Sequence, residues 1–96
     1  MTALRFTWDP AKAAGNERKH GVRFLDAAKA LLGDPLRLWS RTDARPHGEE
    51  RTITVAPAGQ HVLLVIVHTD RSGTIRIISA RHATPTERRR YANRHH

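Results

Sequence analysis

The sequence contains no cysteine, which excludes a disulfide-stapled fold and any thiolate site for zinc or an iron–sulfur cluster. Long hydrophobic runs are missing too: the longest, at positions 62–67, has six residues, whereas a membrane-spanning helix needs about 20. The first ten residues have no apolar core of the kind that a secretory signal peptide requires, so we expect a cytoplasmic protein. Acidic residues are scarce, with nine Asp and Glu against seventeen Lys and Arg, and the formal net charge is +8.

Arginine is what the chain has in excess. Fourteen of the seventeen cationic side chains are arginine and three are lysine. The positive excess lies in residues 1–33, with net +3, and in residues 68–96, with net +5, while residues 34–67 are balanced. A guanidinium binds a phosphate or a carboxylate through two hydrogen bonds, so the composition predicts an anionic partner, either nucleic acid or an acidic protein. A GC-rich genome would enrich arginine as well, without any such partner.

The first third of the chain is predicted to be mainly helical. Asp9 and Pro10 are typical of a helix start, with Asp at the N-cap and Pro at the first helical position, and the helix should cover residues 10–20. Residues 24–32 carry apolar side chains at i, i+3, i+4, i+7 and i+8 and predict a second helix. A short strand is expected before both, at residues 4–8.

The rest of the chain is predicted to form strands and one last helix. From residue 36 the hydrophobic period changes to two, and we expect strands at residues 36–39, 51–55, 62–67 and 74–80. Thr84 and Glu87 fit a capping box that starts the final helix. The 96 residues suffice for one domain. The sequence therefore predicts a single α+β domain, residues 1–96, with a small antiparallel sheet, two N-terminal helices and one C-terminal helix packed on it.

Cleavage of RNA without a metal requires a base for the ribose 2′-hydroxyl, cations for the phosphate and an acid for the leaving 5′-oxygen. The chain has imidazoles, carboxylates and guanidiniums for these roles, and it has no HExxH, Walker or nucleophile-elbow pattern, so we expect neither metal nor cofactor. Lys19 and His20 end the first predicted helix and would supply a cation and a titratable group. Cations at that place also complement the helix dipole, which is the alternative explanation.

Further candidates lie at the edges of the predicted strands. Glu50 beside Arg51 is either a base next to a cation or one half of an ion pair. Arg76 interrupts an apolar strand and Arg81 follows the end of that strand, so the two predict a phosphate clamp, unless Arg76 only marks a solvated face. His68 ends the most apolar strand, as an RNA contact or as a satisfied structural residue.

The two terminal helices carry candidates for RNA binding. Lys12 and Asn16 share one stripe of the first helix with the pair at positions 19 and 20. Arg88 begins a run of three arginines, which forms either an electrostatic footprint for RNA or a solvated face. Tyr91 either stacks on a base or packs the last helix on the sheet.

One combination of motifs resembles a known family. The segment FTWDPAKAAGNERKHGVRF, followed by GDP, EER, VIVHT and IRIISARHATPTERRRY, is similar to the BrnT family of bacterial toxins from Phe6 to Tyr91. The specific part is W-D-x-x-K-x-x-x-N-x-x-K-H-G-V combined with R-I-I-S-A-R. The resemblance implies a RelE-like fold and a ribonuclease that blocks translation. It also implies neutralisation by a dimeric, DNA-binding, BrnA-type antitoxin, which gives a heterotetramer that reaches operator DNA only through the antitoxin.

The resemblance also assigns candidate residues. The matching polar positions in this chain are Lys12, Asn16, Lys19, His20, Glu50, Arg51, His68, Arg76, Arg81 and Tyr91. For catalysis we favour Glu50 or His20 as the base, with Lys19, Arg76 and Arg81 on the phosphate. One position departs from the family pattern: Arg23 stands where a small N-cap residue such as serine is usual, which should weaken the second helix by about 1 kcal/mol.

Two other functions stay open on the sequence alone. The basic composition would also suit a module that binds nucleic acid without cleaving it, and a toxin of this kind would also act by occupying a protein target. From the charge of the chain, we expect the antitoxin to cover the basic face with acidic or carbonyl-rich segments that fold on binding.

Overall fold

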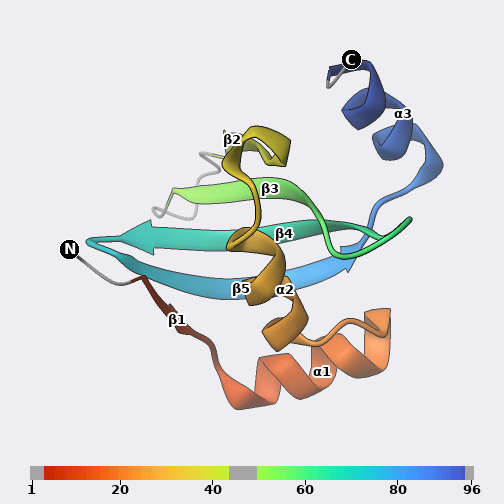
Figure 1. Ribbon diagram of the computed structural model, residues 1–96. Coiled ribbons are helices and arrows are strands. Elements are labelled where there is room, and N and C mark those ends of the chain that lie inside the picture. The colour runs from red at the N-terminus through yellow and green to blue at the C-terminus, as the bar shows by residue number, and fades with distance from the viewer. Residues whose placement is uncertain (1–3, 44–49, 95–96) are drawn as a thin grey trace.

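The computed structural model describes residues 4–43 and 50–94, and in this part of the chain five strands and three α-helices are formed (Figure 1). A short 3₁₀ turn, η1, joins the second helix to the second strand. In chain order the elements are β1 (Arg5–Thr7), α1 (Pro10–His20), α2 (Phe24–Leu31), η1 (Pro35–Arg37), β2 (Trp39–Asp43), β3 (Arg51–Pro57), β4 (Leu63–Arg71), β5 (Thr74–His82) and α3 (Pro85–Arg94).

The strands form one sheet in the order β1-β5-β4-β3-β2. Strands β2 to β5 pair antiparallel with their sequence neighbours, whereas β1 pairs parallel with β5, with Phe6 opposite Ile75. The predicted α+β class is confirmed, but the sheet is mixed and not wholly antiparallel. A parallel neighbour needs a long crossover, and the chain from α1 to β4 supplies it.

Helices α1 and α2 lie on one side of the sheet; in Figure 1, α2 is drawn in front of the strands and α1 lies below them. The main core is there: Phe24 and Ala27 of α2 are buried against Leu64, Ile66 and Ile77 of the sheet, together with Val22, Ala28, Ala30, Ala56 and Ala80. The amphipathic pattern of residues 24–32 therefore turned its apolar stripe to the sheet as predicted.

The opposite face, which we call the open face, carries a smaller apolar cluster. Val55, Leu63 and Val65 are buried there, and Trp39 and Tyr91 pack against them. Helix α3 stands apart from α1 and α2 (Figure 1), and none of its residues is buried. Because it buries so little, α3 depends on a few specific contacts for its position.

Two local expectations had different outcomes. The strand expected at 36–39 starts only at Trp39, because Asp34 caps the 3₁₀ turn by accepting a hydrogen bond from the Leu36 N–H at 3.0 Å. Helix α2 starts without a side-chain cap, as predicted for Arg23; its guanidinium instead pairs with Asp26 at 3.2 Å. No helix among the described residues is long and apolar enough to cross a membrane.

Candidate active site at the β5–α3 junction

Several residues of the sequence motif around α1 have structural roles in the fold. Asp9 caps the helix by accepting a hydrogen bond from the Ala11 N–H at 2.9 Å. Asn16 is buried, and its amide donates to the carbonyls of Val22 at 3.0 Å and Ala80 at 2.8 Å, while its oxygen accepts from the Ala80 N–H at 3.1 Å. An RNA contact requires an accessible amide, so we reassign Asn16 to holding α1 on β5.

The cationic residues of the same motif remain accessible. Lys12 and Lys19 are exposed on α1 and His20 is half-buried at its end. Gly21 follows with a φ of 69°, a left-handed conformation that glycine adopts easily, and it turns the chain towards α2. Lys19 and His20 are therefore presented at the C-terminal end of α1, where the chain reverses.

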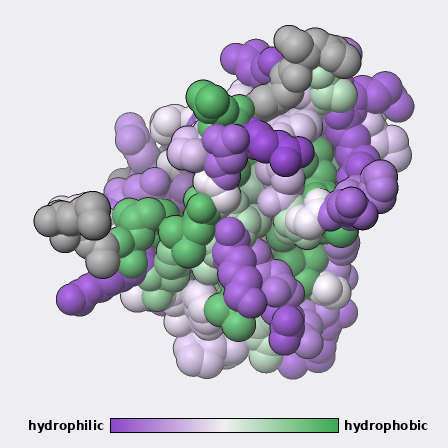
Figure 2. All heavy atoms as spheres, in the orientation of Figure 1, coloured by the Kyte–Doolittle hydropathy of each residue, from purple (hydrophilic) through white to green (hydrophobic). Residues whose placement is uncertain are grey.

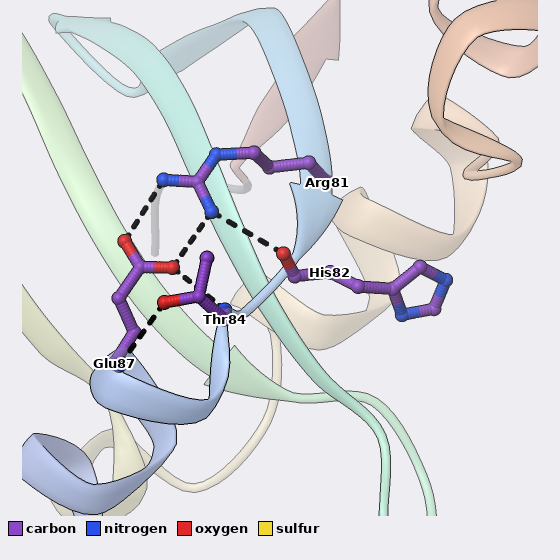
Figure 3. A network of polar contacts seen from close by, with 4 residues as sticks. All are labelled: Arg81, His82, Thr84 and Glu87. Atoms are coloured by element: carbon purple, nitrogen blue, oxygen red, sulfur yellow. Dashed lines mark hydrogen bonds and ion pairs between the residues drawn. The ribbon is translucent and has the colours of Figure 1, made fainter.

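Arg81 is held by an acid from the next helix (Figure 3). Its guanidinium donates to the two carboxylate oxygens of Glu87 at 2.7 and 2.8 Å and to the His82 carbonyl at 3.2 Å. Glu87 also accepts from the Thr84 N–H at 2.8 Å, and the Thr84 hydroxyl accepts from the Glu87 N–H at 3.2 Å. The predicted capping box is confirmed, and its glutamate also orients Arg81.

This pairing changes the proton affinity of both partners. The hydrogen bonds from Arg81, more than any other contact, lower the pKa of Glu87 from 4.5 to about 2. The pKa of Arg81 is raised, chiefly by the hydrogen bonds to Glu87. The ion pair is thus complete at neutral pH, and it connects the end of β5 to the start of α3.

The C-terminal end of β5 lies beside the C-terminal end of α1. Asn16 bonds to Ala80 in the strand, and Gly21 lines a cleft of about 470 Å³ together with His82. Lys19, His20, Arg81 and His82 are thereby brought to one end of the molecule, and we call these four the junction cluster. His82 is exposed, and its imidazole points away from Arg81 (Figure 3).

Glu50, Arg51 and Arg76 lie towards the opposite end of the sheet. Along β4, Arg81 pairs at Val65 and Arg76 pairs at Thr69, four residues and about 13 Å further on. Arg51 directly precedes Thr52, which pairs at His68, so it lies at this second end as well. The clamp predicted from Arg76 and Arg81 together is therefore not formed; each arginine belongs to a different end.

Arginines do form a row across the open face at this second end. They are Arg41 of β2, Arg51 of β3, Arg76 of β5 and Arg5 of β1. The strand register places them there, because side chains alternate between the two faces of a sheet and the residues next to their pairing partners pack on the helix side. The Nε of Arg51 is buried and has no hydrogen-bond partner among the described residues. We call this set the arginine row. His47 and Glu49 lie outside the described residues.

His68 is part of a chain of polar side chains on the helix side of the sheet. It is 3% exposed; its Nε2 bonds to Thr54 at 2.8 Å, Thr54 bonds to Ser40 at 2.7 Å, and its Nδ1 contacts Asp70. A ring this deeply buried cannot touch RNA, so we reassign His68 to the structural role that was its alternative.

Helix α3 carries the last two candidates. The Tyr91 hydroxyl donates to the Arg37 carbonyl at 2.6 Å and its ring packs on the open-face cluster, which favours the packing role over base stacking. Arg94 lies over the Trp39 ring at 4.8 Å. Arg88 is exposed and lines a cleft of about 390 Å³ with Arg89.

Sequence reasoning did not select His82, and it took Glu87 only as a cap. The available signal was position: both flank Arg81 within six residues, where β5 passes into α3. Arg5 and Arg41 were missed because their membership of the arginine row depends on strand register. In the part of the chain that the structure describes, no three His, Asp or Glu side chains gather as a metal-binding group.

Comparisons with known proteins bear on the family and the fold of this chain. Residues 8–87 match the family described as "Ribonuclease toxin, BrnT, of type II toxin-antitoxin system". Among solved structures, the ribonuclease toxin BrnT of Brucella abortus, determined at 1.1 Å resolution, is similar with a TM-score of 0.63 and 18% sequence identity, over 85% of this chain and 99% of that one. No curated protein matches the sequence. The family match spans most of the chain, and this protein belongs to the BrnT family of ribonuclease toxins of type II toxin–antitoxin systems.

Proposed function

We propose that this protein is a metal-independent endoribonuclease that inhibits translation by cleaving RNA in the cytoplasm, and that the junction cluster is its active site. The observation that carries the proposal is that two imidazoles and two cations lie at the end of the molecule where α1, β5 and α3 meet, with Lys19, His20 and His82 on the helix side of the sheet and Arg81 on the open face. Glu50 and Arg76 then belong to substrate binding at most, since they lie towards the other end of the sheet.

In the proposed reaction one imidazole, of His20 or His82, takes the proton of a ribose 2′-hydroxyl. The 2′-oxygen then forms a bond to the neighbouring phosphorus while the bond to the 5′-oxygen breaks, and the second imidazole protonates that leaving oxygen. The products are a 2′,3′-cyclic phosphate and a 5′-hydroxyl. Lys19 stabilises the negative charge that builds on the phosphate. Arg81, whose side chain lies on the open face, binds a neighbouring phosphate of the RNA.

Glu87 fixes the orientation of the Arg81 side chain for its contact with a phosphate. An arginine side chain has five N–H groups, and the contacts to Glu87 and His82 occupy three of them. The remaining N–H groups, on Nε and Nη2, are held in a fixed orientation and would meet a phosphate without further ordering of the side chain. The side chain is 39% exposed, so a phosphate can approach it.

The test is incubation of the purified chain with RNA in EDTA. Fragments that end in a 2′,3′-cyclic phosphate and a 5′-hydroxyl are the expected result. Intact RNA, or cleavage only after a divalent ion is added, would overturn the proposed mechanism.

We propose further that a BrnA-type antitoxin, dimeric and DNA-binding, neutralises this toxin in a heterotetramer that represses its own operon. The family assignment supports a protein antitoxin. An adjacent gene that encodes a short acidic ribbon-helix-helix protein is expected, and size-exclusion chromatography of the co-expressed pair should give two copies of each chain.

The alternative is a module that binds nucleic acid without cleaving it. The arginine row favours this possibility, because its members lie on four strands of the open face, away from the junction cluster. Retained, salt-sensitive RNA binding with no cleavage by any preparation would select it.

A further inference from the structure

Three adjoining clefts surround the turn between β3 and β4. Their volumes are about 470, 490 and 390 Å³, and Pro57 and Gly59 line all three. The first lies between this turn and α2 and ends at His82, the second passes beside η1, and the third ends under α3. Because they share these residues, the three clefts adjoin one another around the turn, and we call them together the hairpin groove.

The groove has an apolar floor and an apolar flank. Val22, Ala30, Val62, Leu63 and Leu64 line its floor. Beside it, two leucines at the end of α2 and in η1, Leu32 and Leu36, are 60% and 84% exposed. Figure 2 shows a hydrophobic patch over the segment that joins α2 to β2, next to strongly hydrophilic residues. Exposure of leucines on this scale is typical of a surface that a partner covers.

The charges on the rim decide what kind of partner fits. Cations predominate, because the groove is lined by Lys29, Arg37, Arg88 and Arg89 but by only two acids, Asp26 and Asp34. An acidic occupant is therefore attracted. RNA would use the cations but would gain nothing from the leucines, which favour apolar side chains between the acidic ones.

We propose that the hairpin groove is the docking surface for an acidic, amphipathic segment of the antitoxin. This inference rests on the proposed function for the identity of the partner. A segment that fills the groove covers His82, the member of the junction cluster that lines it, at one end and Arg88 at the other. The antitoxin then neutralises the toxin by occupying a surface beside the active site, and not by covering the arginine row.

The test uses the full chain and the antitoxin encoded by the adjacent gene, with affinity measured by isothermal titration calorimetry. Leu36→Asp should weaken antitoxin binding by about tenfold or more, because an exposed leucine that the segment would cover is replaced by a charge that an acidic partner repels. Cleavage of RNA by this variant should equal that of the natural chain. Leu4→Asp is the matched control: Leu4 is 51% exposed but precedes β1, at the other edge of the sheet, and affinity should stay within about twofold.

A second pair of variants tests the role of the charges on the rim of the groove. Arg37→Glu, in the groove, should weaken the complex and reduce its salt dependence, whereas Arg18→Glu, exposed on α1 outside the groove, should change neither. Unchanged affinity in Leu36→Asp and Leu32→Asp would overturn the proposal. It would also be overturned if these variants lost RNA binding, or if the chain alone dimerised and Leu36→Asp made it monomeric. Absence of cleavage by the natural chain would contradict the proposed function and leave the binding result standing.

Discussion

Both ends of the sheet carry arginine side chains, but the groups around these arginines differ between the two ends. At the β5–α3 junction, Arg81 is paired with Glu87, and the imidazoles of His20 and His82 lie at the same end of the molecule. At the other end, the arginine row lies on strands with no imidazole on the open face among the described residues. Proton transfer needs groups that titrate near neutral pH, while binding needs only charge. The difference is the reason why we propose catalysis at the junction and substrate binding at the arginine row.

The largest effect should come from removing an imidazole. His20→Ala and His82→Ala are each expected to slow RNA cleavage by about 100-fold or more, since a general acid or base contributes that much. Glu50→Gln, at the other end, should change the rate by less than about twofold. Single-turnover cleavage of one RNA by all three variants checks this. A severe defect in Glu50→Gln with active histidine variants would move the catalytic site to the start of β3.

Loss of the buried amide should destabilise the junction. Asn16→Ala leaves two carbonyls and the Ala80 N–H without their partners, and we expect the free energy of unfolding to fall by about 3 kcal/mol. Lys12→Ala, on the exposed side of the same helix, should change it by less than about 0.5 kcal/mol. Urea denaturation measures both. Equal stability of the two variants would show that Asn16 does not hold α1 to β5.

Members of the arginine row should affect binding more than cleavage. Arg51→Ala or Arg76→Ala is expected to weaken RNA binding several-fold and to reduce the slope of log K against log salt by about 0.7 to 1. The cleavage rate at saturating RNA should stay close to that of the natural chain. Fluorescence anisotropy at several salt concentrations tests this. An unchanged slope with a reduced rate would reverse the assignment of the two ends.

The smallest effect concerns pH. The pKa of Glu87 is lowered to about 2 by Arg81, so its contribution to stability is fully present above its unfolded value near 4.5 and is lost as the pH falls from there towards 2. Thermal melts of the natural chain between pH 6 and 2.5 should show this loss, and Glu87→Gln should reduce the slope of Tm against pH in that window. Identical slopes would contradict the ion pair.

Sequence reasoning predicted the local elements well, because their signals are local. The Asp9 cap, the glycine that ends α1 and the box at Thr84 each depend on residues within one turn of a helix. It was less successful with polar residues inside strands. His68 ends one apolar run and Arg76 interrupts another, yet His68 is buried on the helix side and Arg76 is exposed on the open face. A β-bulge after Val67 shifts the pairing register between β4 and β5, and the residue pattern does not predict this bulge.

The sequence by itself determined that the protein is a basic α+β domain of the BrnT family with arginine as its chief cation, since composition and short motifs are properties of the chain. Only the tertiary structure decided which cations work together. Arg76 and Arg81 are five positions apart and belong to opposite ends of the sheet, whereas Gly21 and His82 are sixty-one positions apart and line one cleft. The reason is that strand register and crossover connections, which arise from packing of distant segments, set the neighbours of every side chain.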